Sequence, residues 1–130
     1  MVKKSLHSVI IPETVYPKPT KEELAAAYLL LEYFKSDIEF IPRSNISTPD
    51  FLINGVKWEL KSPTGIGKYN IQHLLHHAVK QSLNIIVDAR YSKMHIARIK
   101  NELKLHSTTT SKCVKRLLLI DKQRNIIVIK

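Results

Sequence analysis

The sequence predicts a mixed α/β fold of the α+β kind. Helical periodicity follows Thr20, the dipeptide Asn54-Gly55 joins two strand-like runs, and Asn84–Asp88 is a short apolar run typical of a buried strand. These segments give the order helix, three strands, helix, strand, helix and two strands. A length of 130 residues suits one domain with one core, so we expect residues 1–130 to form a single domain.

Local signals mark the first helix and the arm before it. Residues 1–19 hold a β-prone run at Val9–Ile11 and three prolines, which favour an extended arm. Thr20 can act as an N-cap, and Glu23, three residues later, completes the capping-box pattern. We therefore expect a helix from Thr20 to about Lys35.

Turn residues and periodicity define the remaining elements. Asn54-Gly55 is the strongest short hairpin signal in a sequence, because both residues tolerate the positive φ angles of a type I′ turn. Further helices are expected at Asn70–Leu83 and Tyr91–Leu105. The expected strands are Ile38–Ile41, Asp50–Ile53, Val56–Lys61, Asn84–Asp88 and a closing pair, "CVKRLLLID" and "NIIVIK", around residues 122–125, and Ser62–Gly67 is an expected loop.

The chain carries a strong positive charge. Its 21 Lys and Arg residues face 11 Asp and Glu residues, which gives a formal net charge of +10. We expect a polyanion as partner, with nucleic acid favoured over a membrane surface because no basic amphipathic helix with aromatic anchors is present. No run of 18 apolar residues occurs, so no membrane span is expected. The single cysteine, Cys113, excludes an internal disulfide and a cysteine zinc cluster, and is expected to be a small core residue.

The predicted hairpin holds three charges among apolar residues. Side chains alternate along a strand, so Glu59 and Lys61 share one face. A two-residue turn sets Ile53 opposite Val56. The same register sets Asp50 opposite Glu59, with Cβ atoms about 5 Å apart. Two facing carboxylates repel each other, so this pair calls for a cation.

A divalent metal ion would turn the repulsion into attraction. Two carboxylates bind a hard cation such as Mg²⁺, or Mn²⁺, through oxygen. The metal can orient water and stabilise charge on a scissile phosphate, while Lys61 can position that water or neutralise the transition state. The sequence therefore predicts a phosphodiester-cleaving site at Asp50, Glu59 and Lys61. The alternative is an ordinary salt bridge of Lys61 with one of the two acids.

These residues carry a family resemblance. Pro49-Asp50, eight intervening residues and Glu59-Leu60-Lys61 resemble the signature of the PD-(D/E)xK nuclease superfamily. More narrowly, "PDFLINGVKWELKSPTG" followed by "IQHLLHHAVKQSLNIIVDAR" resembles the C-terminal tRNA-nuclease toxin domains of bacterial contact-dependent growth-inhibition proteins. The resemblance spans about residues 20–90 and implies a restriction-endonuclease-like core, a mixed central β-sheet flanked by helices. Residues 91–130 would add a helix and the closing strands.

The resemblance implies an Mg²⁺-dependent endonuclease that acts in the cytoplasm on RNA, with tRNA favoured, and a cognate immunity protein as partner. Those toxin domains lie at the C-terminal end of very long secreted proteins, whereas this chain begins at Met1. The sequence therefore does not support delivery as part of a larger protein. Two alternatives stay open. One is a PD-(D/E)xK DNA endonuclease for repair, restriction or junction cleavage, and the other is a non-catalytic basic nucleic-acid-binding module.

The superfamily also tends to place an acid of the first helix near the metal. Both Glu22 and Glu23 are available. Glu23 projects toward the apolar side of the helix, whereas Glu22 lies off it, so Glu23 is the expected third acid, catalytic and metal-binding. The alternative is the capping box with Thr20, which would use the same carboxylate.

A basic, histidine-rich surface is expected beside this site. His73 and His77 have a spacing that suits zinc, but no acid completes the H-E-x-x-H pattern, so contact with phosphates is favoured over zinc. An inert solvated face is an equal alternative. Asp88 is expected to be a turn or N-cap residue. The expected nucleic-acid-binding residues are Lys68, Tyr69, Gln72, His76, Lys80, Arg90 and Lys93.

Overall fold

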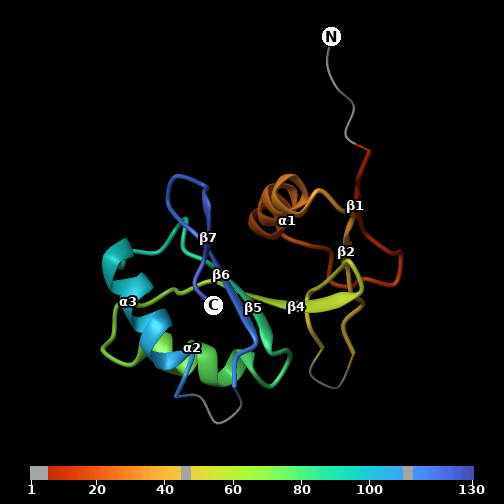
Figure 1. Cartoon of the computed structure of the whole chain (residues 1–130). Coiled ribbons are helices and arrows are strands. Elements are labelled where there is room, and N and C mark those ends of the chain that lie inside the picture. The colour runs from red at the N-terminus through yellow and green to blue at the C-terminus, as the bar shows by residue number, and fades with distance from the viewer. Residues whose placement is uncertain (1–5, 45–47, 110–112) are drawn as a thin grey trace. The chain divides into compact units, whose positions relative to one another are not determined.

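A computed structural model describes residues 6–44, 48–109 and 113–130. The chain forms two compact units, Met1–Lys57 and Trp58–Lys130, and the boundary between them lies inside a strand. Figure 1 shows the helices and strands of both units. The expectation of a single domain stays a prediction.

The first unit contains one helix and a small sheet. β1 (Val9–Ile10) precedes α1 (Lys21–Phe34), which is followed by β2 (Ile38–Phe40) and β3 (Phe51–Ile53). β1 pairs with β2 in parallel, and β2 pairs with β3 antiparallel. Two rings on the paired strands, those of Phe40 and Phe51, meet edge to face with 4.9 Å between centroids, and they help to fill the core of this unit.

α1 begins and ends where the sequence predicts. The Thr20 hydroxyl accepts the N–H of Glu23 at 3.1 Å, and the Glu23 carboxylate accepts the N–H of Thr20 at 3.0 Å. At the other end Lys35 adopts a left-handed φ of 50° and donates its N–H to the carbonyl of Leu31. The buried stripe of the helix consists of Ala26, Ala27, Leu30 and Leu31.

Asn54 and Gly55 form the predicted turn after β3. Their φ angles are 52° and 76°, the left-handed values that a type I′ turn requires at both central positions. The Ser36 hydroxyl donates to Oδ1 of Asn54 at 2.6 Å and so ties the turn to the end of α1. β4 (Val56–Lys61) follows at once, with the bounds that the sequence predicts.

The second unit holds a mixed sheet and two helices. β4, β5 (Asn84–Asp88) and β6 (Arg116–Ile120) are parallel neighbours, and β7 (Ile126–Val128) pairs antiparallel with β6. Parallel neighbours need crossover connections, which α2 (Asn70–Ala78) and α3 (Ile96–His106) supply. Because helices cover them, β5 and β6 are almost wholly buried apolar runs.

α2 and α3 pack against each other and onto this sheet (Figure 1). The core cluster joins Ile71 and Leu75 of α2 and Ile99 and Leu103 of α3 to side chains of β5 and β6. Each of these four residues is fully buried, and burial of one such side chain contributes roughly 1.5–3 kcal/mol. This cluster fixes the faces that the two helices present to solvent.

α2 ends earlier than predicted, at Ala78 instead of Leu83. The carbonyl of Leu83 accepts the N–H groups of Lys115 and Arg116, so the chain is drawn out of the helix toward β5 and β6. Helical periodicity in the sequence continues past this point, whereas the structure replaces the helix with turn bonds, such as that from the N–H of Gln81 to the carbonyl of Ala78, and with pairing to a distant segment.

α3 begins later than predicted, at Ile96 instead of Tyr91. The preceding stretch is a turn in which the Ser92 hydroxyl accepts the N–H of buried Met94 at 3.1 Å. The imidazole of His95 then accepts a backbone N–H of the first helical turn at 3.1 Å and acts as the N-cap.

The mixed α+β fold class is confirmed. The described residues include three helices and seven strands, in the predicted order after the short β1. Among these residues no helix is long and apolar enough to cross a membrane. The expectation for Cys113 is wrong, because its side chain is exposed and the neighbouring Val114 takes the inward position before β6.

Candidate active site and nucleic-acid surface

Glu59 and Lys61 form an ion pair on β4. The Nζ atom of Lys61 lies 3.1 Å from Oε2 of Glu59, so the two side chains share one face of the strand, as predicted. The Glu59 side chain is 5% exposed and that of Lys61 is 30% exposed. The acid is therefore largely removed from water, while the base still reaches solvent.

The surroundings of this pair are apolar. In the parallel register Glu59 lies beside Ile85 and Lys61 beside Val87, and paired residues point to the same face of a sheet. Ile85 and Val87 belong to the core cluster that α2 and α3 cover. A carboxylate at the margin of such a core is costly unless cations compensate it. Lys61 supplies one positive charge, and a divalent cation would add to it.

Asp50 lies in the first unit, directly before β3. The residue is partly exposed, and its backbone carbonyl accepts the N–H of Ile41 at 2.9 Å. Because Glu59 and Lys61 belong to the second unit, the facing of Asp50 and Glu59 stays a prediction from the turn. Among the residues that the structure describes, no group of three His, Cys, Asp or Glu side chains has the arrangement of a metal site.

The carboxylate of Glu23 already has two partners. One oxygen accepts the N–H of Thr20 in the capping box, and the other lies 3.2 Å from Nη2 of Arg43. The capping box was the alternative to a metal-ligand role for this residue, and it is present. To serve as a third acid, Glu23 would have to release at least one of these bonds.

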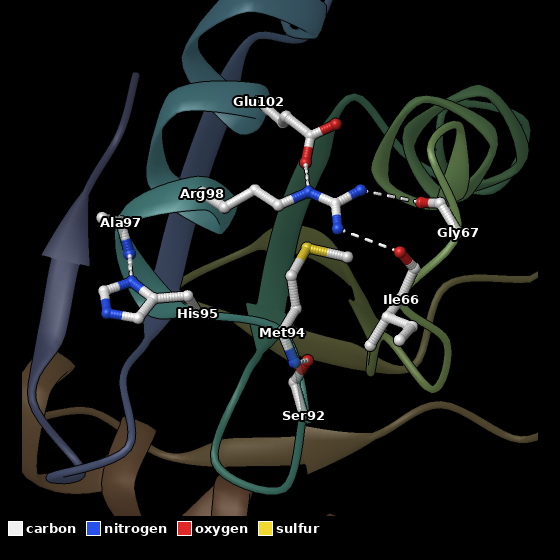
Figure 2. A network of polar contacts seen from close by, with 8 residues as sticks. All are labelled: Ile66, Gly67, Ser92, Met94, His95, Ala97, Arg98 and Glu102. Carbon is white, nitrogen blue, oxygen red and sulfur yellow. Dashed lines mark hydrogen bonds and ion pairs between the residues drawn. The ribbon is translucent and has the colours of Figure 1, made fainter.

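Arg98 of α3 holds the loop that follows the motif lysine. Its Nη1 and Nη2 atoms donate to the carbonyls of Ile66 and Gly67, both at 2.9 Å, and its Nε donates to Glu102 at 2.8 Å. Figure 2 shows the guanidinium spanning from Glu102 to the loop backbone. These bonds fix the loop between the end of β4 and the start of α2. Lys68 directly follows the fixed residues Ile66 and Gly67.

Lys68 and Tyr69 lie together on the surface after this loop. The Lys68 ammonium sits 5.5 Å from the centre of the Tyr69 ring, which in turn stacks on His73 with 6.1 Å between centroids. All three residues are exposed. A cation and two accessible rings in this arrangement suit a phosphate and a base.

A pocket of about 280 Å³ opens beside these rings, between α2 and the end of α3. Its lining residues are Gln72, His73, His76, His106 and Thr109. Two of the predicted nucleic-acid-binding residues, Gln72 and His76, thus share one cavity. Lys80 and Lys93, predicted for the same role, are exposed elsewhere in this unit.

Arg90 is not on the predicted basic surface. Its side chain is only 4% exposed, and its guanidinium donates to both carboxylate oxygens of Asp88, at 2.9 and 2.8 Å. The same carboxylate accepts the backbone N–H of Arg90 at 3.1 Å, so Asp88 is the expected turn residue. The burial of this ion pair does not favour a nucleic-acid contact for Arg90, and that role stays a prediction.

A comparison with known protein families gives a match. The profile of the contact-dependent growth inhibition CdiA C-terminal domain matches residues 47–126, which include β3, β4, β5 and β6 and end at the first residue of β7. The chain belongs to this family. Because the family is defined as a C-terminal domain, the position of Met1 is no argument against delivery within a longer protein. That expectation is withdrawn.

A solved structure supports the fold of this CdiA C-terminal domain. The chain is similar to one in a CdiA-CT/CdiI toxin and immunity complex from Burkholderia pseudomallei, with a TM-score of 0.67 and 22% identity. The likeness covers 95% of this chain and 98% of that one. No curated protein matches the sequence.

Some residues of this surface were not predicted from the sequence of the CdiA C-terminal domain. Arg98 and Glu102 have the i, i+4 spacing of a helical ion pair, and this spacing could have indicated them. His106 and Thr109 had no such signal, because only the packing of α3 on α2 brings them to the pocket.

Proposed function

We propose that this CdiA C-terminal domain is a toxin with metal-dependent endonuclease activity, and that RNA, tRNA in particular, is its substrate. The observation that carries the proposal is the buried acid of the Glu59–Lys61 pair, which follows Pro49-Asp50 at the spacing of a PD-(D/E)xK site. Family membership supports a role in growth inhibition. The net charge of +10 supports a nucleic-acid substrate.

Asp50 and Glu59 are the residues that would hold Mg²⁺ or Mn²⁺. Their carboxylate oxygens are the donors that such hard cations prefer, and the desolvated position of Glu59 favours a further positive charge. When bound, the metal supplies activation of water and stabilisation of charge on the phosphate. Glu23 is bound to Thr20 and Arg43, so we assign it first to the cap of α1.

Lys61 has the role of a cation that touches the reacting group. Its ammonium has three donors, and one is directed to Glu59, so the ammonium could at the same time orient water or a phosphate oxygen. With 30% of its side chain exposed, Lys61 can reach a substrate in solution. The lysine thus offers a fixed positive charge where negative charge develops in the transition state.

The proposal also includes a protein partner and a place of action. The similar chain from Burkholderia pseudomallei comes from a toxin and immunity complex, so we propose a cognate immunity protein, acidic and covering the site, for this domain. We propose the cytoplasm of the target cell as the place of action, since that is where its RNA substrate lies.

Incubation of the pure protein with total RNA and with plasmid DNA, each with Mg²⁺ or with EDTA, tests the function. We expect RNA fragments only in the presence of metal. Cutting of DNA alone would move the assignment to a DNA endonuclease. If nucleic acid still binds in EDTA and neither substrate is cleaved in Mg²⁺ or Mn²⁺, the proposed enzymatic activity is refuted. The protein would then be a nucleic-acid-binding module.

A further inference from the structure

The pocket between α2 and α3 differs from an ordinary polar surface in its composition. Three of its five lining residues are histidines, and the other two, Gln72 and Thr109, carry uncharged hydrogen-bonding groups. We call these five residues the histidine groove, which consists of Gln72, His73, His76, His106 and Thr109.

The electrostatics of the histidine groove favour an anion. No Asp or Glu lines it, and α2 contains no acidic residue at all. The single acid of α3, Glu102, is bonded to Arg98. An imidazole offers an N–H donor whether it is neutral or charged, so each histidine of the groove can bond to an anion.

The rim of the groove offers a surface for a base. Tyr69 and His73 stack with 28° between their ring planes, and 55% of Tyr69 is exposed. Lys68 lies over the same tyrosine ring. Unpaired RNA bases commonly stack on aromatic and histidine side chains, while their phosphates meet cationic groups.

A metal ion fits the groove less well than a nucleotide does. Among the described residues no set of three His, Cys, Asp or Glu side chains has the arrangement of a metal site, although three histidines line this groove. A volume of about 280 Å³ is far more than one ion needs, and it lies just below the usual range of small-molecule pockets.

We propose that the histidine groove binds one nucleotide of the RNA substrate outside the cleavage site. His73, His76 and His106 hold its phosphate, the base stacks on the Tyr69 rim, and Gln72 and Thr109 bond to polar groups of the sugar or base. This subsite rests on the proposed nuclease function. It would hold the strand on the face of the sheet where Lys61 emerges, because α2 and α3 cover that face.

The first test uses adenosine 5′-monophosphate with the full chain carrying Lys61→Met, which separates binding from cleavage. Nitrogen-detected NMR of the imidazoles should show saturable shifts at the three groove histidines, smaller shifts at His77, whose ring meets that of His76, and none at His95, which lies outside the groove. Adenosine should bind more weakly, and inorganic phosphate should shift the same signals. Equal shifts at His77, or shifts at no histidine, would overturn the proposal.

The second test compares matched variants. His106→Gln should weaken binding of adenosine 5′-monophosphate about tenfold, as expected for loss of a charge-assisted hydrogen bond, whereas His77→Gln should leave it unchanged. In cleavage assays His106→Gln should raise KM more than it lowers kcat. If the wild type cuts RNA and His106→Gln binds the nucleotide and cuts RNA equally well, the proposed nucleotide subsite is refuted and the nuclease function is retained. If no substrate is cut but the nucleotide still binds, the nuclease function is refuted and nucleotide binding by the groove is retained.

Discussion

Glu59 and Lys61, two positions apart on β4, are joined by a 3.1 Å contact in which the acid is buried and the base reaches solvent. A plain surface salt bridge has both groups in water and contributes little to stability. This pair is different because the carboxylate lies beside the core residue Ile85. The asymmetry places the carboxylate out of water and its partner ammonium where solvent can reach it.

Replacement of Lys61 should separate catalysis from folding. Lys61→Met removes the ammonium and should lower cleavage at least about 100-fold, the scale of losing one electrostatic contact to a transition state. Lys61→Arg keeps the positive charge beside Glu59, so its fold should match the wild type. Rates come from gel assays and folding from circular dichroism. Wild-type cleavage by a folded Lys61→Met variant would refute the mechanism.

Metal binding should stabilise the protein through Asp50 and Glu59. A ligand at 100 times its Kd adds about 2.7 kcal/mol to the free energy of unfolding, so Mg²⁺ should raise Tm by several degrees. Asp50→Asn should abolish the rise, whereas Glu32→Gln, at an exposed acid of α1, should not. An undiminished rise in Asp50→Asn would show that Asp50 and Glu59 do not share an ion.

Glu23 should behave as a cap. Thr20→Ala removes one half of the capping box and should cost about 1 kcal/mol of stability, measured by urea unfolding. Glu23→Gln keeps an oxygen that can accept the N–H of Thr20, so stability should change little and cleavage should persist. A loss of cleavage as large as that of Lys61→Met, with the fold intact, would instead make Glu23 the third acid.

Arg98 should control the order of the loop after Lys61. Arg98→Ala leaves the exposed carbonyls of Ile66 and Gly67 without this donor and should cost on the order of 1 kcal/mol. Amide hydrogen exchange at Lys68 to Asn70 should accelerate more than exchange in β5. Glu102→Gln retains a hydrogen-bond acceptor and serves as the milder control. Unchanged exchange in Arg98→Ala would mean that the loop is held by other contacts.

The Asp88–Arg90 pair should be structural. Arg90→Ala leaves Asp88 as a buried, uncompensated charge and should cost about 3–5 kcal/mol of stability, measured by urea unfolding. Arg116→Ala serves as the control, since it removes an exposed arginine whose guanidinium donates to the side-chain amide oxygen of Asn84. This variant should change stability by about 0.5 kcal/mol or less. Similar losses in the two variants would contradict a special role for the buried pair.

Much of the fold follows from local sequence, because local hydrogen bonds and side-chain periodicity are written in neighbouring residues. The capping box at Thr20, the Asn54-Gly55 turn and the bounds of β4 and β5 were all predicted correctly. On the site, local alternation also gave the shared face of Glu59 and Lys61. Each of these features depends on residues at most a few positions apart.

What only the tertiary structure decided depends on contacts between distant segments. The end of α2 is set by the bonds of Leu83 to Lys115 and Arg116, and Arg90 is withdrawn from the surface by burial beside Asp88. The histidine groove exists because α3 packs on α2 and brings His106 to His73. The sequence determined which chemical groups are present and their local geometry, whereas burial and packing over long sequence separations determined which of them face solvent together.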